Sequence, residues 1–529
     1  MEPKDSEGRF ITLSDLAEYD VPVREPDRPK YRYSITKIAI GLVILALIGS
    51  LIYKITKTSI QNLAPTNPTF SAPYVDATLT PTYNFQVPSN NPTGQVVLGF
   101  VVAGSNSCEP SWGGYYTLNQ ANTTLDMQRR IKEVANTGGS TMISFGGLNG
   151  PDLFAKCTNI ADLVAAYQSV ISTYSVRAID FDIEGAALAD SAGIARNAAA
   201  IDALERTNPN LNVWITLPVA LSGLTPQGEA VVRSLIVNHD KFAGINVMAF
   251  DFGTPIQNMV GAVEGTLESV HGQLTTIFAA NHLPSGSRSV WNKIGATLMI
   301  GQNDSSGERL SVEDAQTLDQ FFANVRVRRV SFWSLNRDVS CTQSVSGAAI
   351  LSSYCSGVTE QPLQFSTVFS NFNSSIVPSK SPNTLIIQNN HGITSASNAP
   401  YPIWTSYGEY PQGYKVVWQG NIYEANYFTG GVAPSNTQGA QTSTDAWTII
   451  GPVLQTDKAP VIPRLPSGTY PNWSPTQVYQ SGDHVEVDGL GYVARYSNSG
   501  SNPSATIANS TQSPWIPLFQ IPGEPTTAN

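Results

Sequence analysis

The chain has 529 residues, too many for one hydrophobic core, so we expect three or four domains. Charged residues make up only 13% of it and the formal net charge is −10, which argues against a nucleic-acid partner because no basic stripe is available to neutralise phosphates. The 42 glycines, 35 prolines and 9% aromatic residues are typical of a globular protein with many strands and turns, not of a coiled coil.

The N-terminal region contains one long apolar run. Residues Ile38–Tyr53 carry no charge, and extending the run to residues 35–57 brings it to the ~20 residues that a membrane-spanning helix needs. We therefore predict a retained signal anchor, with residues 1–34 as a cytoplasmic tail because basic residues are more frequent before the run than after it. This prediction makes the protein a single-pass cell-membrane protein with a linker at 58–71 and the rest outside. A cleaved signal peptide, which would release a secreted protein, is the alternative.

All four cysteines follow this run, and an even number of cysteines in an exported chain predicts two disulfides. Three connectivities are possible, of which we prefer Cys108–Cys157 and Cys341–Cys355. The cysteine spacings match no zinc pattern and the five histidines are scattered, so we predict no metal site and no cofactor.

Residues 72–372 alternate between strand-like and helical stretches. Most of the strand-like runs are continuously apolar, as expected of strands buried on both faces of a parallel sheet. The eight runs are 73–79, 95–103, 141–145, 176–183, 212–219, 245–250, 294–300 and 327–333. Eight strand–helix units over roughly 300 residues predict an α/β fold, the (β/α)8 or TIM barrel. A doubly wound open sheet is the alternative, although it usually has fewer strands.

The composition changes after the predicted barrel. Residues 373–397 are rich in Ser, Asn and Pro and are predicted to be a linker. Residues 398–452 and 469–519 form a diverged repeat in which tryptophans flank tyrosine-rich segments, with a second linker at 453–468 and a tail at 520–529. We predict two small β modules that either build their cores from aromatic residues or display them.

The most informative stretch is Ala178–Gly185, AIDFDIEG, in the fourth predicted strand. Asp180, Asp182 and Glu184 occur at every second position, so all three side chains lie on one face of the strand, which points inward in a closed barrel. They occur at the C-terminal end of the strand, where barrel enzymes have their active sites. Carboxylates this close cannot all ionise freely, so at least one pKa must rise, and a carboxylic acid that stays protonated near neutrality can act as a general acid.

This strand resembles the D-x-x-D-x-D-x-E motif of the family 18 glycoside hydrolases, the chitinases, with Arg177 in place of the first Asp. Three other predicted strands resemble that family in the same order along the chain. The matching residues are Ser144-Phe-Gly146-Gly147 for the family's S-x-G-G, Met248-Ala-Phe250-Asp251 for its M-x-Y-D, and Trp333 for its hydrophobic platform. The resemblance covers about residues 70–360.

The resemblance implies a substrate-assisted, retaining mechanism. Glu184 would protonate the glycosidic oxygen and later activate water, while Asp182, sharing a proton with Asp180, would orient the substrate's N-acetyl group. The substrate-binding residues implied by position are Ser144, Met248, Phe250, Asp251, Gln302 and Trp333. Phe250 departs from the family because the expected Tyr donates a hydrogen bond to the acetamido carbonyl; Gln302 is a candidate substitute donor.

The C-terminal segments resemble small chitin- and cellulose-binding modules, in which planar rings stack on the apolar faces of sugars. The candidate sugar-binding residues are Trp404, Tyr427 and Phe428 in the first module and Trp473 and Tyr496 in the second. Tyr423, Trp447 and Tyr492 are expected in the module cores.

Together these observations predict a monomeric, membrane-anchored extracellular chitinase that binds chitin or N-acetylglucosamine oligomers. An endo-β-N-acetylglucosaminidase of the same family is one alternative. A chitin adhesin that has lost turnover is another, and Phe250 keeps that hypothesis open.

Overall fold

The computed structural model describes residues 34–63, 67–106, 108–341, 351–372, 399–434, 445–505 and 513–525. The chain divides into two compact units, residues 1–60 and 61–529. Helix α1 (Ile35–Leu63) begins in the first unit and includes the start of the predicted linker at 58–71. The predicted linker at 373–397 lies outside the described residues, as does almost all of the predicted N-terminal tail.

The predicted membrane anchor is wrong. Among the helices in the described ranges, none is long and apolar enough to cross a membrane. The uncharged run Ile38–Tyr53 has 16 residues, which span about 24 Å in a helix, against a bilayer core of about 30 Å. Extending the run to 35–57 adds three lysines, whose charges oppose burial in hydrocarbon. Two predictions that depended on the anchor are therefore also wrong. These are the single-pass membrane localisation and the membrane as a partner.

The predicted (β/α)8 barrel is confirmed. Its first strand has two parts, of which β1 (Phe70–Ser71) pairs with β14 (Arg329–Trp333) and β2 (Tyr74–Asp76) pairs with β3 (Gln95–Ala103), so the sheet closes. The other barrel strands are β6 (Ser140–Gly146), β7 (Ala178–Asp182), β8 (Asn212–Ala220), β10 (Gly244–Met248) and β11 (Ile294–Met299). All neighbouring barrel strands are parallel, and each overlaps one of the eight predicted runs.

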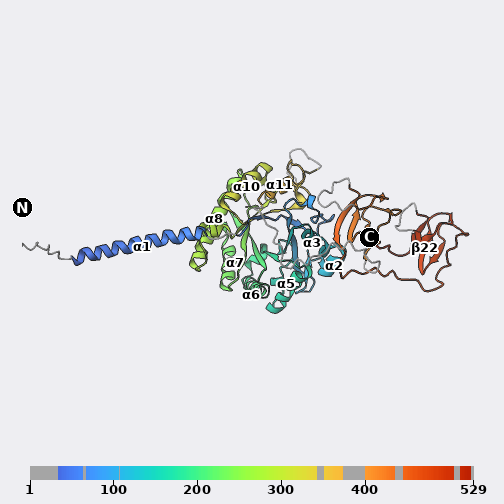
Figure 1. Cartoon of the computed structure of the whole chain (residues 1–529), viewed down its shortest axis with the longest axis horizontal. Helices are drawn as coiled ribbons and strands as arrows, with labels where there is room; N and C mark the ends of the chain where they lie inside the picture. Colours follow the sequence, from blue (N-terminus) through green and yellow to red (C-terminus); the bar gives the residue numbers. More distant parts are fainter. Residues whose placement is uncertain are drawn as a thin grey trace, which may run out of the picture. The chain divides into compact units, whose positions relative to one another are not determined.

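Helices surround the barrel strands, as seen for α5 to α8 in Figure 1. The helices of this unit are α2 (Leu118–Thr124), α3 (Met127–Asn136), α4 (Leu153–Lys156), α5 (Ile160–Tyr174), α6 (Ser191–Thr207), α7 (Pro226–Val237), α8 (Met259–Ala280), α9 (Ser287–Trp291), α10 (Val312–Val325) and α11 (Gln364–Ser370). Short strands add β4 (Pro110–Trp112), β5 (Tyr116–Thr117), β9 (Gly223–Leu224), β12 (Gly301–Gln302) and β13 (Arg309–Leu310). Apolar residues between strands and helices form the main core.

A second, smaller core fills the inside of the barrel, and Trp214 is its largest side chain. Two glycines on the next two strands of the sheet, β10 and β11, make room for this indole. A Cβ at Gly244 would lie 2.5 Å from the Trp214 ring, and one at Gly295 would lie 3.1 Å from it. The interior of the barrel is therefore packed, so only the ends of the barrel are open to a ligand.

Both predicted disulfides, Cys108–Cys157 and Cys341–Cys355, are confirmed. The first ties the segment after β3 to the end of α4. The second closes a loop that follows β14. Both therefore fix connecting segments on the barrel's periphery.

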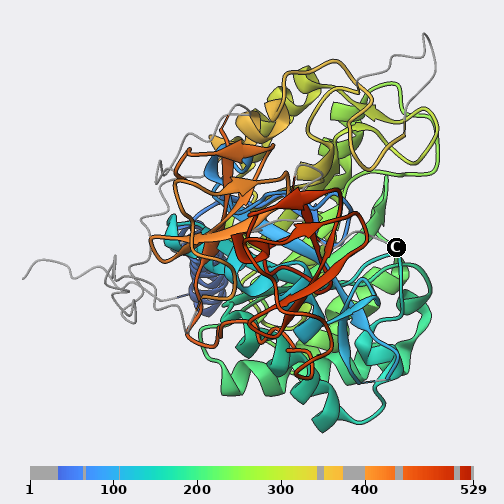
Figure 2. The same cartoon turned by 90° about the vertical axis from the view of Figure 1, so that its right-hand side faces the viewer.

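The C-terminal region contains two β units, drawn in orange and red in Figure 2. The first has strands β15 (Glu409–Tyr410), β16 (Lys415–Trp418), β17 (Asn421–Ala425), β18 (Thr429–Gly430) and β19 (Trp447–Pro452). The second has β20 (Val478–Tyr479), β21 (His484–Val487), β22 (Leu490–Ala494), β23 (Asn498–Ser499) and β24 (Trp515–Pro517). Each unit combines a three-stranded and a two-stranded sheet in the same order. Tyr423 and Trp447 are buried in the first unit, and Tyr492 is buried in the second.

The chain after β24 returns to the first β unit. The backbone N–H of Lys415 donates to the carbonyl of Gly523 at 2.7 Å, and the Tyr414 hydroxyl donates to the carbonyl of Pro522 at 3.1 Å. Ile521 belongs to the apolar core of the same unit. Residues 521–523, expected to be part of a tail, thus complete the first β unit.

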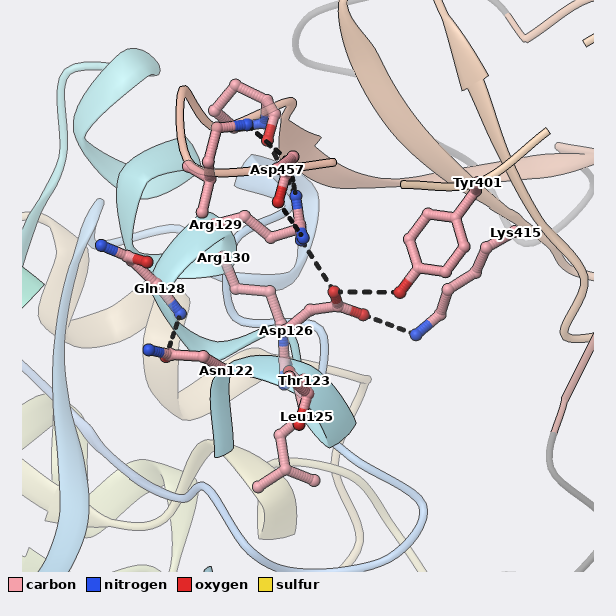
Figure 3. Close-up of polar contacts among 12 residues, drawn as sticks. Asn122, Thr123, Leu125, Asp126, Gln128, Arg129, Arg130, Tyr401, Lys415 and Asp457 are labelled. Atoms are coloured by element: carbon pink, nitrogen blue, oxygen red, sulfur yellow. Dashed lines mark hydrogen bonds and ion pairs between the residues drawn. The ribbon is translucent and has the colours of Figure 1, made fainter. Parts of the chain in front are cut away.

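The first β unit also contacts the barrel through a cluster of charges at the start of α3 (Figure 3). The carboxylate of Asp126 accepts hydrogen bonds from Lys415 Nζ at 2.5 Å and from Arg129 Nε at 2.7 Å. Arg129 in turn donates to both oxygens of Asp457, at 3.0 and 3.2 Å. Tyr401 also donates to Asp126, at 3.4 Å.

Candidate active site

Strand β7 brings the predicted carboxylates to the carboxyl end of the barrel. Asp180 and Asp182 lie on its inward face and are 0% and 3% exposed, while Glu184 follows the strand and is partly buried. The intervening Phe181 faces outward, where its ring lies 5.3 Å from Phe145, centroid to centroid. The apolar outward face anchors the strand against the helices and keeps the acidic face inside.

Asp180 is held by four hydrogen-bond donors from four other strands. Its Oδ2 accepts from the hydroxyls of Tyr74 and Ser144, both at 2.8 Å. Its Oδ1 accepts from Thr216 Oγ1 at 2.7 Å and from Arg329 Nη1 at 2.8 Å. Tyr74, Thr216 and Arg329 were not foreseen as site residues. In the sequence, the only sign of these three residues' role is that each is a polar residue inside a strand that is otherwise apolar.

A further layer of hydrogen bonds supports the side chains that hold Asp180. Asn246 Nδ2 donates to Thr216 Oγ1 at 2.9 Å and to Thr297 Oγ1 at 2.7 Å. Arg329 Nη2 donates to the Tyr74 hydroxyl at 2.9 Å. Because these side chains come from strands all around the barrel, the orientation of Asp180 depends on closure of the whole sheet.

The two carboxyl groups nearer the mouth of the barrel are protonated more readily than free acids. Burial raises the pKa of Asp182 well above its usual range, and the negative charges of Glu184 and Asp180 raise it further. Burial and the nearby Asp251 raise the pKa of Glu184 to about 7. Asp152, after β6, has a pKa raised to about 7 by burial and by the charge of Glu184. An acid of this strength is suited to general acid–base catalysis near neutral pH.

The two glycines of the S-x-G-G motif have a steric function. Gly146 has φ +93°, and a Cβ there would lie 2.2 Å from the carbonyl oxygen of Asp182. Gly147 has φ +83°, and its Cβ would lie 2.9 Å from the Phe100 ring. Larger residues would therefore displace β7 and the aromatic residue Phe100.

The predicted platform residue Trp333 is half-buried at the end of β14, where its ring stacks on Phe100 with the centroids 5.7 Å apart. Asp251 is also half-buried, and its Oδ1 accepts a hydrogen bond from the backbone N–H of Ser305 at 2.6 Å. Met248 and Phe250 are both partly exposed.

Gln302 is placed differently from the expectation that it donates to a bound sugar. Its side-chain amide donates to the backbone carbonyls of Asn303 and Glu308, at 3.0 and 3.1 Å. Both amide hydrogens are thus directed at the protein's own backbone. A replacement for the hydroxyl missing at Phe250 has to come from elsewhere.

The candidate sugar-binding aromatics fall into two groups. Trp404 and Trp473 are half-buried against the cores of their β units. Tyr427, Phe428 and Tyr496 are 46%, 54% and 43% exposed. Within the described ranges, no group of three or more His, Cys, Asp or Glu side chains could hold a metal ion.

A closed (β/α)8 barrel with inward carboxylates at the carboxyl end of its fourth strand, one of them with a pKa near 7, has the site of a glycoside hydrolase. No family model matches the sequence. Curated relatives do match: "Probable bifunctional chitinase/lysozyme" from Escherichia coli is 31% identical over 57% of this chain, and "Endochitinase 11" from Metarhizium anisopliae is 30% identical over 51% of it. The matches cover 34% and 52% of these relatives' own lengths.

Solved structures agree with the curated relatives. The catalytic domain of a hyperthermophilic chitinase from Pyrococcus furiosus is 27% identical, with a TM-score of 0.50, and the match covers 58% of this chain and 96% of that one. Active domain 2 of a thermostable chitinase from the same organism, solved with chito-oligosaccharides, is 26% identical over 58% of this chain and 95% of that one, with a TM-score of 0.51. The barrel is accordingly a glycoside hydrolase domain similar to chitinases.

Proposed function

We propose that this protein hydrolyses β-1,4 linkages between N-acetylglucosamine units of chitin, with retention of configuration and with assistance from the substrate's acetamido group. The observation that carries the proposal is the carboxylate row, in which Asp180 is anchored by four donors while Glu184 has a pKa of about 7. The chitinases among the relatives support this choice of substrate.

In the first step Glu184 is the general acid. Its proton passes to the glycosidic oxygen as the bond from that oxygen to the anomeric carbon breaks. The carbonyl oxygen of the neighbouring N-acetyl group forms the new bond to the anomeric carbon, giving a cyclic oxazolinium ion. No carboxylate nucleophile is required in this scheme.

In the second step the Glu184 carboxylate removes a proton from water, and the water oxygen attacks the anomeric carbon as the oxazolinium ring opens. Asp182 orients the acetamido group through both steps. Its buried Oδ1 has no hydrogen-bond partner among the described residues, which leaves it able to accept the acetamide N–H. Trp333 lies beneath the sugar ring, and Met248, Phe250 and Asp251 form the remaining substrate contacts. Ser144, expected to bind substrate, is fully buried and acts instead through its hydrogen bond to Asp180.

The test compares the full-length protein with its Glu184→Gln variant on chitin oligomers. We expect kcat to fall by about 10²–10⁴-fold, as it does when a general acid is lost. Glu229→Gln, which removes a carboxylate paired with Arg233 on the surface, is the matched control and is expected to leave the rate unchanged. Equal rates for wild type and Glu184→Gln would refute the assignment, and inactivity of both with retained chitin binding would favour an adhesin.

Two further measurements separate this mechanism from its alternatives. With an activated aryl leaving group the loss caused by Glu184→Gln should be smaller, because such a group departs with less help from an acid. Proton NMR of the first product formed should show the β-anomer; the α-anomer would exclude retention. Cleavage of N-glycans but not of chitin oligomers would favour the endo-β-N-acetylglucosaminidase.

We also propose that the two C-terminal β units bind chitin through their exposed aromatic rings. Tyr427 and Phe428 support this for the first unit because apolar rings displayed to solvent suit the faces of sugars. The test is chitin pull-down of a Tyr427→Ala/Phe428→Ala double variant. Tyr407→Ala is the control, since Tyr407 is 84% exposed in the same unit but lies outside the predicted binding motif. Equal binding by all three proteins would contradict the proposal.

A further inference from the structure

Arg329 is a fully buried cation directly beneath the catalytic carboxylates. Its side chain is 0% exposed and makes three hydrogen bonds, to Asp180, to the Tyr74 hydroxyl and to Ser331 Oγ. Burial opposes its charge, but Asp180 and these hydrogen bonds hold its pKa above the usual value. A buried guanidinium is costly unless a carboxylate compensates it, so Arg329 and Asp180 form a mutually dependent ion pair.

The geometry of this pair decides which aspartate can hold a proton. An ionised carboxylate offers about four acceptor positions on its two oxygens. In Asp180 four donors occupy them, two at each oxygen. An acid hydrogen on Asp180 would displace one of these donors, and displacing Arg329 would leave a buried charge without its partner. Asp182, by contrast, has an oxygen with no partner among the described residues.

We propose that Arg329 is a positioning residue that keeps Asp180 ionised throughout the reaction, so that the proton of the aspartate pair stays on Asp182. The expectation that the two aspartates exchange this proton is thereby replaced by a fixed division, with Asp180 as a permanent anion and Asp182 as the proton carrier. A neutral Asp182 lies beside Glu184 without adding a negative charge, and its unprotonated oxygen can still accept the acetamide N–H. This inference rests on the proposed function.

Groups from several elements act on this pair and enter any pH dependence. The titratable and charged groups that face it are Tyr74 from β2, Arg329 from β14, Glu184 after β7 and Asp152 after β6. Arg329 is the one cation among these four. Its removal should therefore increase the proton affinity of the aspartate pair.

A first measurement tests the protonation states without any substrate. Carbon-13 NMR of the full-length protein labelled at the aspartate carboxyl carbons is followed between about pH 4 and 9, with the signals assigned from Asp180→Asn and Asp182→Asn. We expect the Asp180 signal to stay at the ionised position and the Asp182 signal to titrate. Titration of the Asp180 signal in the wild type would overturn the proposal. This result is independent of whether the protein cleaves chitin.

A second measurement tests the role of Arg329 through the pH profile of kcat/KM. In Arg329→Gln we expect the alkaline limb to move to higher pH by about 1–3 units, the usual effect of an adjacent charge, with a lower maximum rate. Arg329→Lys keeps the charge and should retain the wild-type midpoint despite a reduced kcat. A loss of thermal stability with an unchanged profile in Arg329→Gln would mean that the role is only structural. If Arg329→Gln does not fold, a shifted midpoint in Arg329→Lys would overturn the proposal.

Discussion

The charge cluster between the barrel and the first β unit is centred on one buried carboxylate, Asp126, and we expect Asp126→Asn to destabilise the protein strongly. The side chain of Asp126 is 3% exposed and forms ion pairs with Arg129 and Lys415. Its backbone has φ 51°, a left-handed conformation that Asn tolerates well. The substitution therefore removes the charge with little change in shape or backbone strain.

The size of the effect follows from what each cation retains. Breaking a buried ion pair by removing one partner costs about 3–5 kcal/mol. Here Arg129 keeps Asp457 at 3.0 Å, and Lys415 keeps Glu424 at 3.9 Å. These second carboxylates offset part of the loss, so we expect the free energy of unfolding to fall by about 2–4 kcal/mol. An exposed pair such as Arg233–Glu229 is worth only about 0.3–0.5 kcal/mol.

The assay is urea unfolding at neutral pH, with Glu229→Gln as the control for a lost surface carboxylate. The difference between wild type and Asp126→Asn should also depend on pH. Lys415 and Arg129 outweigh the effect of burial and lower the pKa of Asp126 below 3.8. A carboxyl group whose pKa is lower in the folded state than in the unfolded state stabilises the fold at any pH above its unfolded-state pKa. This stabilisation is lost as the pH falls through its folded-state pKa. The difference should therefore narrow below about pH 4. If Asp126→Asn lowers the free energy of unfolding at neutral pH by no more than Glu229→Gln does, the ion-pair explanation is refuted.

Three further outcomes are expected. The pKa of Glu184 is raised from 4.5 to about 7, so its charge destabilises the fold as the pH rises through that range. Glu184→Gln should therefore raise Tm relative to wild type at about pH 8 but not at about pH 4. An equal change in Tm at both pH values would contradict the raised pKa. Phe250→Tyr should increase kcat about 10-fold or more by supplying a donor to the acetamido carbonyl; a gain with Phe252→Tyr instead would move that donor to the residue after Asp251. Gly244→Ala should lower the free energy of unfolding by about 1–3 kcal/mol because the methyl group would overlap the Trp214 ring, whereas Gly272→Ala, which meets no atom within 4 Å, should not lower it.

Patterns local in the chain predicted much of this protein. Eight apolar runs specified eight barrel strands, and the two-residue period of AIDFDIEG specified that Asp180 and Asp182 face inward. Hydropathy alone misled at residues 35–57, where the uncharged run is too short to span a bilayer. The cysteine count left three pairings open, and only the folded chain selected one of them.

The supporting residues around the site were decided by tertiary structure alone. Tyr74 and Arg329 are separated by 255 positions, yet they meet because closing the barrel brings the first strand beside the eighth. In sequence, Arg329 is one basic residue in a short basic run, and nothing in a strand's period shows that its side chain ends beneath Asp180. The same holds for Asp126 and Lys415, 289 positions apart. The strand sequence by itself determined which carboxylates share the inward face of β7, because side-chain alternation is a local property. Which charges compensate those groups depends on long-range closure, and only the fold decides it.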